Sequence, residues 1–536
     1  MPKDTTPTYI HQFPLRTCPW QVRKLMIRMN ALRDCYNGIM GEGFKRLNKL
    51  RKDPKHQQCI KEYKALMTEL KPLERKHNAL ISIQQDKATS ASLKALEKQM
   101  RPLLTQKKSL QRRFSELDKK HGFTQYALQP FATAMKNKSY MKHHLDGDTV
   151  QVISDRVFQA LNAYRYGQKG RPRFKSSQKG LRSISGKANR CLRFTDKGKF
   201  SWNGLVLDVI YDTKDKHLVQ QHALNSEKKY VRLIHRQHKG KNTFYMQLVL
   251  KGEPLKKANY PIGQGKTVGL DLGVSTLAAV SKDKALLTPF VMELDNLQQD
   301  IQRLQRKASR KLRLLNPDNY NEQGALIKGR KTWQKSNHYH KLQEEIRSLY
   351  ETMRHKRTHL HYQLVKNVLA MGNHLHIEKN NYKAWQKGLY GKTIGFRAPS
   401  QFETLLTRKA LQTGGQVTFI DARKAKLSQY NHVSDTYTKK TLNDRIQVLD
   451  DNTIVQRDLY SAALAYSFDF KKNQVDRIRL EKEWKSLDTG FKWALATLYD
   501  QYTNSRNKDL FPSCLRHKDV LELERIAHES LFDTSQ

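Results

Sequence analysis

The chain of 536 residues is long enough for several compact units rather than one. It carries 99 lysines and arginines against 50 acidic residues, a formal net charge of +49, and 38% of its residues are hydrophobic. Such an excess opposes compaction unless a polyanion neutralises it, so we expect nucleic acid as the partner. The alternative is a generally basic, soluble protein. This alternative is weaker, because the excess of basic residues is spread along the whole chain rather than confined to one tail.

The five cysteines are scattered and form no C-x-x-C pair, which argues against a disulfide framework and against a classical zinc finger. No apolar run approaches the roughly 18–20 residues that a membrane span needs. Residues 1–14 lack the apolar core of a secretory signal. We therefore expect no membrane partner and a cytoplasmic protein, located in the cytoplasm or nucleoid of a prokaryote.

The first half of the chain is predicted to be mostly helical and then β. Residues 9–15 predict a short strand. Over residues 22–117 leucines recur every three or four positions, which predicts packed helices with a turn at 86–92, and helical patterns continue to about Tyr164. From 190 to 252 the pattern alternates with a period close to two, which predicts a small β-barrel or sheet.

Between these regions lies a basic, glycine-punctuated stretch, residues 165–187, that also carries Tyr166 and Phe174. Contacts to phosphates and unstacked bases require basic side chains beside aromatic planes. We therefore favour nucleic-acid binding over a solvated loop. The residues expected to contact nucleic acid are Arg171, Arg173, Phe174, Lys175, Lys179 and Arg182.

The second half of the chain alternates strands with helices. The patterns predict, in order, two strands of a hairpin at 267–280, helices joined by a basic loop over 294–372, strands at 373–378 and 417–421, a helix at 455–468, and a helical tail from 472.

Three acids stand where catalytic acids are expected. Asp271 interrupts an apolar strand before a glycine turn, Glu378 ends another apolar strand, and Asp458 begins an alanine-rich helix. Such positions can converge on one edge of a sheet. Carboxylates suit Mg²⁺ or Mn²⁺, and two such ions about 4 Å apart can catalyse phosphodiester hydrolysis. Taken singly, Asp458 also fits a helix cap and Glu378 a surface strand end; the ordered set is more specific than any member.

The acids and their surroundings resemble a known family. Asp271 in GLDLGV, Glu378 after its strand and Asp458 in RDLYSAA are similar to the RuvC-I, -II and -III motifs of the TnpB nucleases and the compact type V CRISPR effectors. The resemblance covers about 267–467, and residues 170–176 resemble a basic segment that precedes the RuvC domain. It implies an RNA-guided DNA endonuclease with one RuvC site, formed by Asp271, Glu378 and Asp458.

The resemblance also implies a bilobed α+β multidomain protein. It would have a helical recognition lobe, a β-barrel-like wedge domain and an RNase H-like (RuvC) α/β nuclease domain with a helical insertion. The expected divisions are a first wedge strand (1–17), the recognition lobe (18–164), the wedge domain (165–262), RuvC part I (263–293), the helical insertion (294–372), RuvC part II (373–420), a degenerate zinc-ribbon-like target-strand-loading segment (421–454), and RuvC part III with a helical tail (455–536).

The implied cofactors are two Mg²⁺ or Mn²⁺ ions and a guide RNA. The implied partners are that RNA, with its scaffold and spacer, and double-stranded target DNA with a short flanking motif; we favour a monomer. Two alternatives stay open. One is an RNA-guided DNA-binding protein that represses or recruits without cleavage, and the other is a guide-independent transposase or resolvase of the same fold.

Two positions depart from the family pattern. Family members usually have a four-cysteine zinc ribbon after a Ser-Gln pair, but Ser428 and Gln429 are followed by no cysteine in this chain's corresponding segment. A structural zinc is therefore not expected, and we predict a short metal-free hairpin. The usual Asp-x-Asn-x-Ala of the third motif has Tyr460 in place of the asparagine.

One histidine cluster has metal-like spacing on a predicted helix: His355, His359 and His361. Arginines and a lysine surround them, and positive neighbours discourage a cation. We expect a solvated basic face, in contact with RNA, rather than a metal site.

Overall fold

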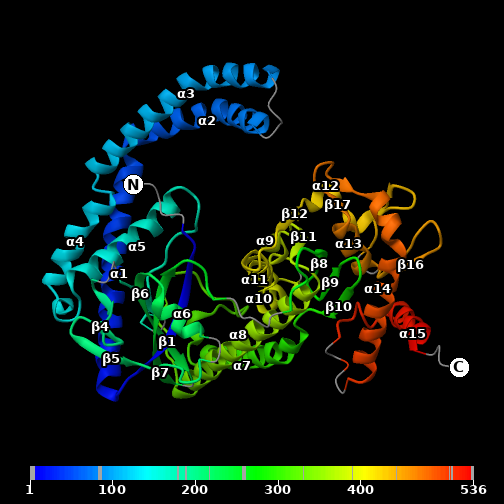
Figure 1. The fold of residues 1–536 in the computed structure, drawn as a ribbon. Coiled ribbons are helices and arrows are strands. Elements are labelled where there is room, and N and C mark those ends of the chain that lie inside the picture. Colours follow the sequence, from blue (N-terminus) through cyan, green and yellow to red (C-terminus); the bar gives the residue numbers. More distant parts are fainter. Residues whose placement is uncertain are drawn as a thin grey trace. The chain divides into compact units, whose positions relative to one another are not determined.

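The computed structural model describes residues 6–81, 87–177, 180–186, 190–215, 218–238, 240–255, 261–329, 331–388, 390–441, 444–505, 508 and 511–532. It divides the chain into two compact units, Met1–Lys256 and Lys257–Gln536. The protein is a mixed α/β multidomain protein, which confirms the coarse fold class (Figure 1). Among the described helices, none is both long and apolar enough to cross a bilayer.

Helices dominate the start of the first unit. Its elements are β1 (Thr8–Arg16), α1 (Pro19–Lys52), α2 (Pro54–Ile81), α3 (Lys87–Lys120), α4 (Gln125–Asn137), α5 (Gly147–Arg165), β2 (Ser183–Ser185), β3 (Leu192–Phe194), β4 (Lys199–Trp202), β5 (Leu205–Val209), α6 (Val219–Asn225), β6 (Lys228–His238) and β7 (Lys241–Lys251). α2 and α3 lie side by side, and α1 packs against α4 and α5 (Figure 1). Residue 86 of the predicted turn at 86–92 lies outside the described residues, and the rest of the prediction is wrong, because this alanine-containing stretch from Lys87 belongs to α3.

The strands of the first unit form one antiparallel sheet in the order β2-β6-β7-β1-β5-β4-β3. Strand β1 joins its two halves, since it pairs with β7 from Thr8 to Pro14 and with β5 at Leu15 and Arg16. The last strand, β3, lies against β6, so the sheet is nearly closed into a barrel. Phe13, Phe200 and Trp202 of these strands are buried in the core that the sheet shares with the helices. The predicted barrel is therefore present, whereas β2 and α6 were not predicted.

The second unit is built on a mixed sheet. Its elements are β8 (Thr267–Leu272), β9 (Thr276–Val280), β10 (Ala285–Pro289), α7 (Asp295–Leu314), α8 (Asn337–Met371), β11 (His374–Glu378), α9 (Tyr382–Trp385), α10 (Gly391–Arg397), α11 (Pro399–Gln412), β12 (Val417–Ile420), α12 (Ala422–Ala425), β13 (Tyr430–Asn431), β14 (Thr436–Tyr437), β15 (Ile446–Val448), β16 (Ile454–Gln456), α13 (Arg457–Tyr466), β17 (Phe468–Asp469), β18 (Gln474–Val475), α14 (Arg477–Thr503) and α15 (Lys518–Phe532).

Five of these strands form the sheet, in the order β10-β9-β8-β11-β12. β8, β9 and β10 are antiparallel neighbours, while β11 runs parallel to both β8 and β12. One face of the sheet packs on α8 and α11 through Val268, Leu270, Leu375 and Ile377. The other face packs on α13. Since side chains alternate between the faces of a strand, Gly269 and Asp271 of β8 belong to the α13 face.

Gly269 brings the backbone of α13 directly against the sheet. A Cβ atom placed on Gly269 would lie 2.1 Å from the carbonyl oxygen of Ala462 and 2.2 Å from the amide nitrogen of Tyr466. Both atoms belong to the backbone of α13, so no side-chain rearrangement could make room. Only glycine permits this approach, which fixes the height of the helix above β8.

We predict that Gly269→Ala destabilises the second unit by at least about 1–3 kcal/mol, the usual cost of overpacking a core. Urea unfolding followed by tryptophan fluorescence measures the change. Gly395→Ala in α10 is the matched control, because a Cβ there meets nothing within 4 Å. Equal midpoints for the two variants would contradict the proposed contact.

Candidate active site

Asp271 and Glu378 lie at the carboxyl ends of two adjacent parallel strands. The register of β8 and β11 pairs His376 with Gly269 and Ile377 with Leu270, so its continuation places Glu378 beside Asp271. Both acids share a sheet face with Gly269 and His376, the face covered by α13. His376 Nδ1 lies 3.0 Å from the carbonyl oxygen of Ala465, which ties β11 to the same helix.

Asp458 enters the site from above this edge. It is the second residue of α13, where a carboxylate is favoured by the positive end of the helix dipole. The hydroxyl of Thr276, at the start of β9, donates to Asp458 Oδ2 over 2.9 Å. Arg457 Nε lies 3.8 Å from Asp458 Oδ1. Asp458 as a whole residue is 8% exposed, so these contacts hold its side chain in a largely buried position.

The other two carboxylates affect the protonation of Asp271. Asp271 is partly accessible to solvent, but the protein around its carboxylate removes most of its water. This burial raises the pKa of Asp271 well above its ordinary value, and the negative charges of Asp458 and Glu378 raise it further. Burial also raises the pKa of Glu378, although a hydrogen bond from the backbone of Leu427 lowers it in part. The structure therefore places the three predicted acids in one electrostatic neighbourhood.

A divalent cation fits this donor set by its chemistry. Hard carboxylate oxygens are preferred ligands of Mg²⁺ and Mn²⁺, and a cation would relieve the repulsion that raises the pKa of Asp271. Within the described part of the chain, however, no three acidic, cysteine or histidine side chains are grouped closely enough to hold one ion together. The carboxylates are thus neighbours without the geometry of a formed metal site.

We predict that Asp271→Asn stabilises the metal-free protein at neutral pH. Below about pH 4 the carboxyl is protonated in both the folded and the unfolded chain. Above that pH the unfolded chain releases its proton first, because the folded pKa is raised, and the wild type loses stability that the amide keeps. Thermal unfolding in a chelator between pH 4 and 8 measures the stability gap between Asp271→Asn and the wild type. This gap should widen as the pH rises. A gap that stays constant would contradict it.

Tyr460, the departure from the third motif, is buried under the segment that lacks the cysteines. Its hydroxyl accepts a hydrogen bond from the backbone N–H of His432 over 3.0 Å and lies 2.8 Å from His432 Nδ1. The hydroxyl and Nδ1 thus share a hydrogen bond, in which the imidazole tautomer decides which atom donates. The ring of Trp484 in α14 lies 4.6 Å from the ring of His432. These contacts join the 430–437 segment to the helix that carries Asp458.

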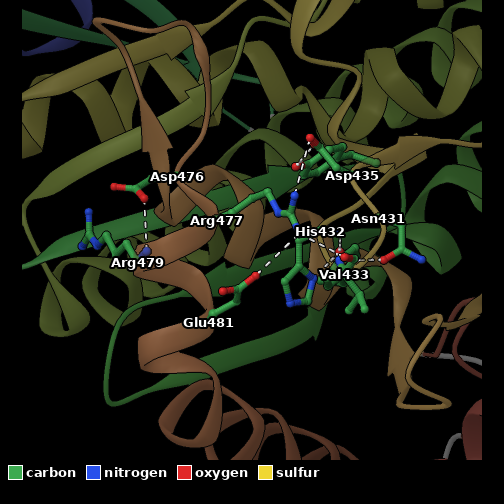
Figure 2. Close-up of polar contacts among 10 residues, drawn as sticks. Asn431, His432, Val433, Asp435, Asp476, Arg477, Arg479 and Glu481 are labelled. Atoms are coloured by element: carbon green, nitrogen blue, oxygen red, sulfur yellow. Dashed lines mark hydrogen bonds and ion pairs between the residues drawn. The ribbon is translucent and has the colours of Figure 1, made fainter.

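A second contact, from α14, holds the same segment. Arg477 Nη2 donates to the carbonyl oxygen of Val433 over 3.0 Å, and its guanidinium forms ion pairs with Asp435 and Glu481 (Figure 2). The described part of the predicted 421–454 segment, which includes residues 430–437, forms two short hairpins, β13–β14 and β15–β16, the second of which ends at Gln456. None of the chain's five cysteines lies in it, and all five are free thiols. Its role in loading a target strand stays a prediction.

We predict that Tyr460→Phe destabilises the second unit by about 1–3 kcal/mol, the cost of leaving buried polar groups unpaired. The two groups concerned are the N–H and the Nδ1 atom of His432, a residue that is 3% exposed. Chemical denaturation measures the loss. Tyr502→Phe in α14 is the control, since it removes a hydroxyl from the same unit away from His432. A loss no larger than that of the control would show that the hydrogen bonds carry no stability.

The basic segment after α5 is docked on α1. Asn37 and Lys175 exchange two hydrogen bonds, of 2.9 and 2.8 Å, between the Asn37 amide and the Lys175 backbone. Arg171 lies over the ring of Phe44 and Lys175 over the ring of Tyr36. These two cations are thus already engaged with aromatic rings.

Of the other residues predicted to bind nucleic acid, three are exposed: Arg173, Phe174 and Arg182. Phe174, with 55% of its surface exposed, presents an aromatic plane between basic neighbours. Lys179 lies outside the described residues. The assignment of all six to nucleic-acid contacts remains a prediction.

The histidine cluster divides in the structure. His355 and His359 are exposed on α8, as a solvated face requires, but His361 is fully buried. The expectation of one solvated basic face is therefore wrong for His361. Its ring packs against Phe290 and Phe402, because one helix position in three or four turns toward the core.

Sequence reasoning did not single out Gly269 or Thr276. Gly269 begins the quoted GLDLGV motif and Thr276 follows it by two residues; the glycine inside an apolar strand was a usable signal of close backbone approach. The hydrogen bond from Thr276 to Asp458 had no signal in the sequence.

Comparisons with known proteins cover part of this chain. Residues 254–385 match the family model OrfB_IS605, described as a probable transposase. A search among curated proteins finds no match. Two similar solved structures are a Cas12f1–sgRNA–target DNA complex and a CRISPR-Cas12f ternary complex, both determined by cryo-EM. The first is 11% identical with a TM-score of 0.38 and covers 87% of this chain and 99% of its own. The second is 11% identical with a TM-score of 0.26 and covers 85% and 98%.

TM-scores this low do not establish a shared fold, so the family match is the informative comparison. The matched region contains Asp271 and Glu378, and Asp458 lies beyond it. Over residues 254–385 the chain is thus similar to the TnpB-like probable transposases, the family that its acidic motifs resemble.

Proposed function

We propose that this protein is an RNA-guided DNA endonuclease. It binds a guide RNA, recognises a short flanking motif on double-stranded DNA, forms an R-loop and hydrolyses phosphodiester bonds at one RuvC-like site. The observation that carries the proposal is the burial of three like-charged carboxylates, from two strand ends and a helix start, in a chain of net charge +49. Buried like charges cost stability, and such an arrangement is typical of functional sites.

In this proposal Asp271, Glu378 and Asp458 hold Mg²⁺ or Mn²⁺. The bound ions supply the Lewis acidity for phosphodiester hydrolysis. Thr276 orients the Asp458 carboxylate through its hydrogen bond. Glu378 and Asp271 are held by the register of two paired strands, so neither depends on a loop for its position.

In this proposal the positive charge of the chain binds the phosphate backbones of the nucleic acids. In RNA-guided recognition base pairing reads the sequence, while the protein holds a heteroduplex by its backbone and shape. The exposed side chains of Arg173, Phe174 and Arg182 offer two cations and one aromatic plane for such contacts. We assign them to nucleic-acid binding on this ground.

A guide-independent transposase is the second candidate, favoured by the description of the matched family as a probable transposase. Both candidates would use the same three acids. They differ in whether the protein retains a discrete RNA.

We predict that the protein, expressed with its native flanking DNA, co-purifies with a discrete RNA and cuts a matching plasmid in Mg²⁺. Asp271→Ala should lower cutting by more than about 100-fold. Losing a residue that only hydrogen-bonds to a metal ligand already lowers activity by up to about 100-fold, and loss of the ligand itself should cost more. Asp283→Ala, which removes an exposed acid paired with Lys266 in the same unit, is the matched control. RNA sequencing and plasmid cleavage are the readouts.

Each other outcome selects an alternative. A discrete RNA with guided binding but no cutting would identify a binding protein without nuclease activity. Cutting without a specific RNA would identify a guide-independent nuclease. Equal cutting by both variants would remove Asp271 from the active site.

A further inference from the structure

The turn that joins β8 to β9 lies between two residues of the candidate active site. Asp271 lies in β8 just before the turn, and Thr276, the donor to Asp458, is the first residue of β9. The Gly273 N–H donates to the Thr276 carbonyl oxygen over 3.0 Å and closes the turn. A displacement of this turn would therefore move Asp271 and, through Thr276, the hydrogen-bond partner of Asp458.

Arg397, the last residue of α10, joins the turn to α7. Its Nη1 donates to the carbonyl oxygen of Val274 over 3.0 Å and to the hydroxyl oxygen of Ser275 over 3.4 Å. Its Nη2 pairs with the carboxylate of Asp295, the first residue of α7, over 2.8 Å. Arg397 is 4% exposed, and a buried cation is costly unless it is paired and hydrogen-bonded, as this one is. The guanidinium thus fixes the turn to a helix outside the sheet.

Asn380 joins the turn to the strand that carries the second acid. The register of β8 with β11 ends one residue before the two acids. Asn380, two residues after Glu378, donates from Nδ2 to the carbonyl oxygen of Leu272 over 3.3 Å. Leu272 directly follows Asp271. The Asn380 amide therefore links the chain beyond Glu378 to the chain beyond Asp271, past the end of the backbone pairing.

The main chain on both sides of Asn380 is itself held in place. The N–H of Lys379 donates to the carbonyl oxygen of Ile420 in β12 over 2.9 Å. Asn381 Oδ1 accepts from the N–H of Ala384 over 3.1 Å and caps α9. Because both neighbours of Asn380 are anchored, its amide restrains the turn rather than moving with it.

Metal binding by the three acids requires such restraint. Burial and the neighbouring negative charges raise the pKa of Asp271, so the carboxylates that would attract a cation repel one another in its absence. Functional sites hold their groups within about 0.5 Å of the productive geometry, and loss of a supporting contact lowers metal affinity by about 10–100-fold. The contacts at Leu272 and Val274 use backbone oxygens on either side of Gly273. They therefore restrain the turn without using the carboxylate of Asp271.

We propose that Asn380 and Arg397 are positioning residues of the active site. They act through the turn, and they hold Asp271 and Thr276 where the three carboxylates can share divalent ions. This inference rests on the proposed function, because it assumes that these carboxylates bind metal.

Manganese binding to the full chain, freed of nucleic acid, tests the proposal without relying on cleavage. Electron paramagnetic resonance measures bound Mn²⁺, and the Mn²⁺ bound by the wild type but not by Asp271→Ala is the fraction at the site. In Asn380→Ala the dissociation constant of this fraction should rise by about 10–100-fold. Arg397→Lys should raise it as well, because a compact ammonium group cannot contact both the turn and Asp295.

Asn373→Ala is the matched control for Asn380→Ala, because it removes an amide just before the opposite end of β11. Asn373 is fully buried, donates to the Thr413 carbonyl oxygen over 3.2 Å and accepts from the Gly265 N–H over 2.9 Å. Its loss should lower the midpoint of urea unfolding more than the loss of the partly exposed Asn380 does. The Mn²⁺ affinity of the control should nevertheless stay unchanged.

Plasmid cleavage gives a second readout, which a purely structural role would not change in this way. In Asn380→Ala the Mg²⁺ concentration for half-maximal cutting should rise by a similar factor, while the rate at saturating Mg²⁺ stays near that of the wild type. Arg313→Lys, which alters a contact with the Gly324 carbonyl oxygen in the same unit, is the control for Arg397→Lys. It should leave both quantities unchanged, and it serves as the control for both variants if Asn373→Ala does not fold.

The outcomes separate this inference from the function on which it rests. Unchanged Mn²⁺ affinity in Asn380→Ala and Arg397→Lys would overturn the positioning role and leave the metal site intact. An equal loss of affinity in Asn373→Ala would also overturn it, because general loosening of β11 would then explain the effect. A wild type that binds no more Mn²⁺ than Asp271→Ala would overturn the metal site of the proposed function, and this inference with it.

Discussion

The backbone contact between β8 and α13 is the constraint on which the rest of the second unit depends. A glycine lets the helix lie directly on the sheet, and its N-terminus then carries Asp458 to the edge where Asp271 and Glu378 end their strands. Every residue of α13 except Arg457 is buried. Apolar burial on this scale offsets the cost of bringing three carboxylates out of water.

The sequence was sufficient for features that depend on local pattern. A carboxylate that interrupts or ends an apolar run, or that begins a helix, can be recognised from the sequence alone. Asp271, Glu378 and Asp458 could therefore be predicted as a set without knowledge of their proximity. The strands that carry the first two follow from their apolar runs, and the barrel of the first unit follows from alternation. The short helices α9 and α10 carry no comparable periodicity and were missed, since helices of four to seven residues are held by their neighbours.

Other features depend on contacts between distant residues. The same basic stretch contains Lys175, which lies over Tyr36, and Arg173, which is exposed; composition cannot separate a cation held by an aromatic ring from one available to phosphate. His361 appeared in one cluster with two exposed histidines, although its position on the helix turns it inward. Nor could the sequence show that the segment without cysteines contacts the residue that replaces the motif asparagine. The contact is the one between His432 and Tyr460.

This meeting has a consequence for the conditions in which the protein works. A ribbon closed by thiolates and zinc is released by chelators and by oxidation of its sulfurs. In this chain a phenol, an imidazole and an indole ring hold the corresponding segment, and none of them needs a metal supply or a reducing environment. The attachment of this segment to the helix that carries Asp458 should therefore persist under metal starvation and oxidative stress.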